Sequence, residues 1–147
     1  MNYVRFLTGN KVLNTAIVCW FAAQILKFII VLITERRVDV KRMLGSGGMP
    51  SSHSSCTVGM ATMVARVCGF YAPEFAISAV LAFIVMYDAS NVRHAAGEQA
   101  KVLNYMIRHW RETTPEIFGR ELKELLGHTP LQVVVGALLG LGIGLIM

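Results

Sequence analysis

Two short segments of this chain combine a histidine with residues that could hold an anion. The first is the glycine- and serine-rich stretch 45–55, in which Pro50 suits the entrance of a helix and His53 follows shortly after it. Glycines free the backbone to turn, serines cap helix starts, and the N–H groups at a helix N-terminus favour phosphate. His53 would suit proton transfer beside such a phosphate, because histidine titrates near neutrality. The alternative is a glycine- and serine-rich turn with an interfacial histidine.

The second segment, 127–136, places His128 at the expected start of the last apolar helix. Gln132 lies one helical turn further on, where its amide oxygen can accept a proton from the imidazole. An imidazole oriented in this way can act as a nucleophile. The alternative is a polar helix cap. We interpret the other two histidines, His94 and His109, as solvated, because both lie in the charged loop 91–129.

Lys27 lies inside the first apolar run, where a buried ammonium is costly unless it is paired or hydrated. Its side chain either snorkels to the membrane surface or faces the interior of the protein and binds an anion. We favour the second interpretation, in which Gln24, one turn earlier, would share the ligand. Asp88 and Arg93 bracket the end of the third apolar run. They either pair with each other, or Arg93 presents its planar guanidinium to phosphate oxygens.

Composition indicates that a bilayer surrounds the elements that position these residues. The chain has 147 residues, of which 54% are hydrophobic and 16% charged, and this is too apolar for an ordinary soluble domain. The net charge is +5, but the basic residues sit between apolar runs and form no nucleic-acid-binding motif, so we expect no nucleic-acid partner. We also expect no metal site, because His53 and His128 lack cysteine or carboxylate partners at ligand spacing.

Four apolar segments are candidates for membrane-spanning helices, which need about 20 residues each. They cover residues 12–34, 52–71, 73–90 and 130–147, within a single domain that occupies the whole chain, 1–147. The second segment is rich in small residues, so we expect it to pack inside the bundle. In the fourth, three glycines recur every fourth residue and can support either internal helix packing or a homodimer: Gly136, Gly140 and Gly144.

Basic residues predict the orientation of these helices. The loop after the first span carries Arg36, Arg37, Lys41 and Arg42, and the loop 91–129 carries further arginines and lysines. The positive-inside rule therefore places both loops, and the site, on the cytoplasmic side, which we expect to be that of a bacterial inner membrane. Within the second loop, a helical period around 102–110 predicts an interfacial helix, and a shorter helix is predicted from 114 to 127.

The motifs resemble those of the type 2 phosphatidic acid phosphatase superfamily, which includes the vanadium-dependent haloperoxidases. Residues 50–54, Pro-Ser-Ser-His-Ser, are similar to its Pro-Ser-Gly-His-Ser motif, and residues 128–133 with the following Gly136 resemble its final His-x-x-x-Asp-Val motif. The fuller pattern looks like the divergent bacterial and plastid branch. It includes Gly47-Gly48-Met49, Asp88-Ala89, Val92-Arg93, Gln99-Ala100, Leu103-Asn104 and Gly127.

This resemblance implies an all-helical fold and hydrolysis of a phosphate monoester or pyrophosphate, which we expect to be lipid-linked. The reaction would need no cofactor, and vanadate would bind as a phosphate mimic. The resemblance implies that His128 is the nucleophile that forms a phosphohistidine, and that His53 protonates the leaving oxygen and later activates water. The nonbridging oxygens would be held by Lys27, Arg93, Gly48, Ser51 and Ser52.

Three features depart from the superfamily pattern. Gln132 replaces the orienting aspartate, so it can fix the tautomer of the imidazole but cannot stabilise an imidazolium with negative charge. The arginine that normally lies just before the nucleophile is absent, and Arg93 would fill its role. An Arg-Pro pair that follows the lysine is also absent, and Arg36, Arg37 or Arg42 would substitute for it. The alternative function is therefore a catalytically impaired protein that binds or transports phosphate or lipid phosphate.

Overall fold

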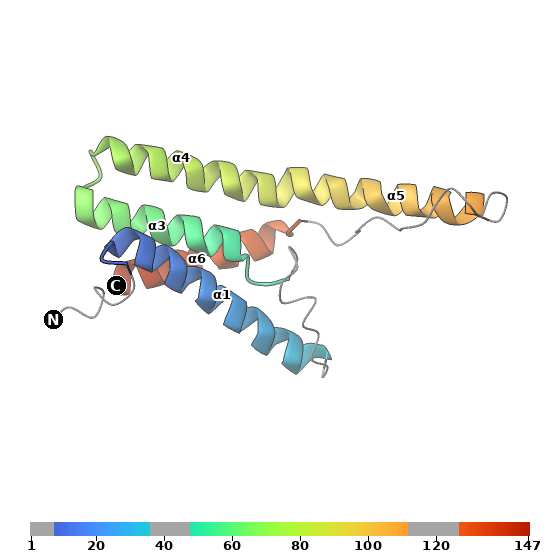
Figure 1. Ribbon diagram of the computed structural model, residues 1–147, viewed down its shortest axis with the longest axis horizontal. Helices are drawn as coiled ribbons and strands as arrows, with labels where there is room; N and C mark the ends of the chain where they lie inside the picture. The colour runs from blue at the N-terminus through green and yellow to red at the C-terminus, as the bar shows by residue number, and fades with distance from the viewer. Residues whose placement is uncertain (1–7, 36–47, 112–126) are drawn as a thin grey trace.

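The computed structural model describes residues 8–35, 48–111 and 127–147, and all regular elements within these ranges are helical (Figure 1). The predicted all-α fold is thus confirmed. The elements are α1 (Lys11–Glu35), α3 (Ser52–Cys68), α4 (Pro73–Tyr87), the π-helical turn η2 (Asp88–Val92), α5 (Arg93–Arg111) and α6 (Pro130–Ile146).

Helix α3 lies at the centre of the bundle. It packs against α1, α4 and α6, and α1 also contacts α6. Small side chains make this central place possible, because Ser54, Ser55, Ala61 and Ala65 of α3 are all buried against neighbouring helices. The least hydrophobic of the four predicted spans is therefore the one that other helices shield, as the sequence predicted.

Glycines allow α3 and α6 to approach to backbone contact. A Cβ added at Gly136 would overlap the carbonyl oxygen of Ser51, and one added at Gly140 would overlap that of Ser55. Gly144 is buried against the same helix. Of the two interpretations of the glycine repeat, the structure shows internal packing, so α3 already covers this face within one chain.

Large apolar side chains are exposed around the bundle, as expected of helices that face lipid. Phe21 of α1, Phe83 of α4 and Leu138 of α6 are examples. Two stretches, Lys11–Thr34 and Pro73–Arg108, are long and apolar enough to cross a membrane. Helices α3 and α6 have 17 residues each, which is at the short end of the range of about 17–25 for a spanning helix.

The structure differs from the sequence-based expectation in the segment after the third span. We expected that span to end at Ser90 and a separate interfacial helix to follow around 102–110. Instead, α4, η2 and α5 form one continuous rod from Pro73 to Arg111, whose far end extends beyond the other helices (Figure 1). No proline interrupts this stretch, and the π turn changes the helical register without ending the helix. The shorter helix predicted at 114–127 lies almost entirely outside the described residues.

Candidate phosphate site

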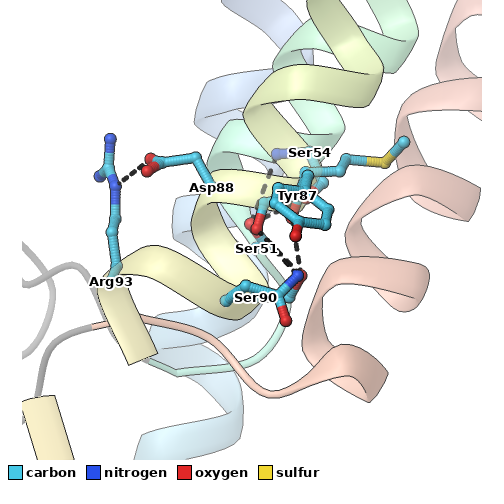
Figure 2. A network of polar contacts seen from close by, with 8 residues as sticks. Ser51, Ser54, Tyr87, Asp88, Ser90 and Arg93 are labelled. Atoms are coloured by element: carbon cyan, nitrogen blue, oxygen red, sulfur yellow. Dashed lines mark hydrogen bonds and ion pairs between the residues drawn. The ribbon is translucent and has the colours of Figure 1, made fainter. Parts of the chain in front are cut away.

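The first motif forms a capped entrance to α3. Gly48 adopts a φ of 95°, in the left-handed region that favours glycine. Ser51 is the N-cap of α3, and its hydroxyl oxygen accepts hydrogen bonds from the N–H and the hydroxyl of Ser54 (Figure 2). Ser51 and Ser52 are both buried. The predicted helix start is therefore present, with His53 in its first turn.

His128 is held between η2 and the start of α6. Its backbone N–H donates to the carbonyl oxygen of Ala89 over 2.8 Å. Its Nδ1 lies 3.2 Å from Oε1 of Gln132, and the same oxygen accepts the N–H of Thr129 in a capping box. Because Oε1 is an acceptor in this box, Nδ1 must carry the ring proton. The lone pair of the imidazole therefore lies on Nε2.

The environment of His128, just before the first residue of α6, favours the neutral ring. Burial lowers the pKa of His128 below its ordinary value of 6.5. The hydrogen bond with Gln132, and more weakly a contact with the backbone of Gly48, act in the opposite direction, whereas the positive charge of Lys27 lowers the pKa further. A neutral imidazole with a free Nε2 is the form that a nucleophile requires.

His53 and His128 lie side by side, although they are distant in the sequence. Their ring centroids are 6.1 Å apart, with an angle of 62° between the ring planes. At this separation, hydrogen bonds of ordinary length allow both rings to contact one phosphoryl group. The structure thus brings together the two histidines of the two motifs.

Lys27 extends from α1 into the same region. It is only 2% exposed, and its Cδ would lie 3.3 Å from a Cβ added at Gly48, so its stem packs on the glycine turn. The burial contradicts the snorkelling interpretation. Within the described part of the chain, no hydrogen bond or ion pair holds its ammonium, yet its charge acts on both His53 and His128.

Among the described residues, three buried side-chain polar atoms have no hydrogen-bond partner: Oε1 of Gln24, Nδ1 of His53 and Nε2 of His128. All three belong to residues that the sequence singled out, and Gln24 lies one turn from Lys27 on α1. Buried polar groups are normally satisfied by protein or by water, so these three atoms are available to a bound ligand or to water. The positive charge of Lys27, which has no partner among the described residues, favours an anion there.

Asp88 and Arg93 form an ion pair at the edge of this site. Nε of Arg93 lies 2.6 Å from Oδ2 of Asp88, and the side chains are 42% and 36% exposed (Figure 2). Of the two predicted alternatives, the pair is therefore present, but Arg93 remains near the site because its charge acts on His53. His94 is exposed, as predicted. The side chain of His109, and all of Arg36, Arg37 and Arg42, lie outside the described residues.

Sequence reasoning missed the contacts that fix His128 beside η2. Gly127 has a φ of 86° and packs so closely on the backbone of Arg93 and His94 that a Cβ there would overlap it. The carbonyl of Ala89 accepts the His128 N–H. The sequence predicted Gly127 as the end of a helix and not as a contact of Arg93. A π turn has no characteristic residue pattern, so the position of the Ala89 carbonyl could not be predicted either.

An apolar groove of about 550 Å³ lies between α4 and α6, with α3 beneath it. One end is formed by Ser90, which follows Ala89, and by Pro130, which lies close after His128. The groove thus has one end in the segments that carry Ala89 and His128, although neither histidine lines it, and it continues along the spanning helices. Its walls include Val58, Phe83, Met86, Val134, Ala137 and Leu141.

These features define a helical membrane protein in which two histidines and a buried lysine lie together near one end of the bundle. The sequence profile of the Divergent PAP2 family matches residues 8–143, which is nearly the whole chain, and the chain belongs to this family. It is 36% identical over 154 residues to YuiD, an uncharacterized membrane protein of Bacillus subtilis strain 168, with 98% of this chain and 97% of that protein covered. No solved structure matches. The resemblance to a divergent branch of the superfamily is thus confirmed, as is the membrane location.

Proposed function

We propose that this protein is a membrane phosphatase that removes phosphate from a lipid-linked phosphate monoester or pyrophosphate through a phosphohistidine. One observation carries the proposal: the ring centroids of His53 and His128 lie 6.1 Å apart beside the buried Lys27, and among the described residues each ring has a buried nitrogen without a partner and the lysine has none either. In the described ranges, no group of three or more His, Cys, Asp and Glu side chains could hold a metal ion. The proposed chemistry therefore uses protein cations to neutralise the charge of the phosphoryl group.

In the first step, Nε2 of His128 attacks phosphorus, and the bond from phosphorus to the leaving oxygen breaks. His53 donates a proton to that oxygen, which leaves as the alcohol or phosphate. In the second step, His53 takes a proton from water, the water oxygen attacks phosphorus, and the P–N bond breaks. Inorganic phosphate is released and both histidines return to their starting states. Lys27 and Arg93 stabilise the charge on the nonbridging oxygens throughout.

The apolar groove supports a lipid-linked substrate. A phosphoryl group between the two histidines would place the attached chain near Ser90 and Pro130, at the start of the groove. An apolar tail can then lie along the groove without leaving the membrane. For a short alkyl phosphate that binds from water, each CH₂ group buried in the groove contributes about 0.8 kcal/mol, which corresponds to roughly fourfold in affinity. A lipid tail that is already in the membrane makes no such gain. The positive-inside rule supports the cytoplasmic face as the side of this site, and the membrane is proposed to be a bacterial inner membrane.

The test of the reaction is phosphate release by the purified full chain in detergent, together with trapping of the phosphoenzyme. We expect wild type and the control His94→Ala to release phosphate and to form an acid-labile, alkali-stable phosphoprotein. His128→Ala should do neither. His94 is a suitable control because it is an exposed histidine near the same end of the bundle. Equal release by wild type and His128→Ala would remove the enzymatic proposal.

The test of the substrate class is a series of alkyl phosphates of increasing chain length. For wild type, we expect kcat/KM to rise with chain length, by up to about fourfold per CH₂ group. Ala137→Phe should fill the groove and flatten this dependence while leaving the shortest ester unaffected. Ala76→Phe is the matched control, because Ala76 is exposed on α4 and away from the groove lining. An unchanged slope in Ala137→Phe would show that the groove does not hold the tail.

The second candidate function is binding or transport of phosphate without hydrolysis. Gln132 favours it, since the contact to Nδ1 of His128 comes from a neutral amide instead of a carboxylate. This candidate predicts that vanadate stabilises the protein against thermal unfolding although no phosphate is released. A phosphohistidine trapped in wild type would exclude it.

A further inference from the structure

We infer that Asp88 positions Arg93 for the phosphoryl group, by holding the guanidinium through Nε and leaving its two terminal nitrogens free to bind phosphate oxygens. This inference rests on the proposed function, because it concerns the same phosphoryl group. Asp88 would touch neither the substrate nor the reacting atoms, so its role is that of a positioning residue.

The pair depends on the π turn. In an α-helix, a residue five positions further on points about 140° around the axis, so Asp88 and Arg93 would not face each other. In η2, the backbone N–H of Arg93 bonds to the carbonyl of Asp88, and this wider turn brings the two residues to the same side. The side chains then meet at 2.6 Å. The π turn thus builds the ion pair.

The same turn also holds the nucleophile of the proposed reaction. Ala89, inside η2, accepts the N–H of His128, and Gly127 packs on the backbone of Arg93. Arg93 and His128 are therefore attached to one short segment of backbone. The charges of Arg93 and Asp88 both act on the ring of His53. A guanidinium fixed to this segment keeps its place relative to His128.

The geometry of the pair leaves part of the guanidinium available. The contact uses Nε alone, and within the described residues Arg93 has no other hydrogen bond or ion pair. Its terminal nitrogens, which form the planar fork that suits phosphate, are thus unoccupied. Because both side chains are more than one third exposed, the pair itself contributes little to stability. Orientation of Arg93 is therefore the role that we assign to the pair.

The opposite role is that Asp88 competes with phosphate for Arg93. The two roles predict effects of opposite sign. If Asp88 positions Arg93, its removal weakens anion binding, because a free side chain must be ordered each time an anion binds. If Asp88 competes, its removal strengthens binding. Measurement of vanadate affinity with the purified full chain in detergent distinguishes them.

We expect Asp88→Ala to weaken vanadate binding by about tenfold, comparable to the loss of one charge-assisted hydrogen bond. Asp88→Asn keeps an acceptor oxygen for Nε and should lose less. In the Arg93→Ala background, Asp88→Ala should have no further effect, since its action passes through Arg93. The matched control is Glu98→Ala, which removes the partner of Lys101 from a similar exposed pair on α5 and should bind vanadate as wild type does.

Each result has a defined meaning. The positioning role would be overturned if Asp88→Ala bound vanadate more tightly than wild type. It would also be overturned if Asp88→Ala lowered vanadate affinity equally in the wild-type and Arg93→Ala backgrounds. A purely structural effect of Asp88 would lower the melting temperature without ligand, whereas positioning leaves it unchanged and lowers kcat/KM together with vanadate affinity. If wild type binds vanadate and Asp88→Ala equals it, this inference alone fails. If wild type does not bind vanadate, the proposed function fails with it.

Discussion

Replacement of Lys27 by methionine should make the empty protein more stable and abolish anion binding. The side chain is 2% exposed and has no partner within the described residues. A lysine at the centre of a spanning helix costs about 2.5–3.5 kcal/mol. With an allowance for partial hydration of the charge, we take about 2 kcal/mol as the gain from Lys27→Met, whose side chain fills a similar space without charge.

Vanadate should make wild type more stable than Lys27→Met. Wild type gains about 2.7 kcal/mol at a vanadate concentration of 100 times Kd, because vanadate binds only the folded state. The Lys27→Met variant gains nothing. The stabilities should therefore cross where wild type has gained about 2 kcal/mol, which the same relation places at roughly 30 times Kd.

The assay is equilibrium unfolding of the full chain in mixed detergent, followed by circular dichroism, with and without vanadate. Lys11→Met is the matched control, because Lys11 is exposed at the start of the same helix. It should change stability by less than about 0.5 kcal/mol and keep the response to vanadate. The reasoning is refuted if Lys27→Met is less stable than wild type without ligand, or if vanadate stabilises it as much as it stabilises wild type.

Three further predictions follow from the contacts of α6. Gly136→Ala should lower the free energy of unfolding by more than about 2 kcal/mol, because the new Cβ would overlap the Ser51 carbonyl. The control Gly142→Ala, with open space around the new Cβ, should leave that free energy unchanged or raise it. Equilibrium unfolding of both variants in detergent measures the difference. Gln132→Glu keeps an oxygen at the Nδ1 of His128 and adds a negative charge. The rate of phosphate release should therefore rise at least about tenfold. An unchanged rate would show that the amide of Gln132 does not limit turnover. Burial lowers the pKa of His128, and the neutral ring is the proposed nucleophile. If so, kcat/KM rises with pH through a limb below 6.5 in wild type, and Gln132→Glu moves this limb to higher pH.

The fold was predictable where composition alone decides it. Long apolar runs predicted the spanning helices, and the serines and small residues of the second run predicted its central place, because such residues pack poorly against lipid but well against helices. The bounds of α6 followed from Thr129 and Pro130, a cap and a first helical residue. The continuation of α4 into α5 was missed, since a π turn requires no special residue at Asp88–Val92.

The site was predictable in its members but not in all its contacts. Lys27 was noticeable because charged residues are rare in apolar helices. The two histidines were noticeable because they lie in motifs, 45–55 and 127–136, that resemble those of a known superfamily. Their convergence depends on the backbone contact of Gly136 with Ser51, a tertiary feature that local patterns do not encode. The partner of Arg93 remained open for the same reason, because in an α-helix Asp88 would have pointed elsewhere.

The rod of α4, η2 and α5 fixes the depth at which the chemistry would take place. Its 15, 5 and 19 residues rise about 1.5 Å each, so the twenty residues from Pro73 to Val92 cover about 30 Å, the thickness of the hydrocarbon layer. A rod that enters the layer at Pro73 leaves it at η2, level with the headgroups. A lipid-linked substrate of the proposed reaction would then arrive by diffusion in two dimensions, and turnover would depend on its mole fraction in the membrane instead of its bulk concentration.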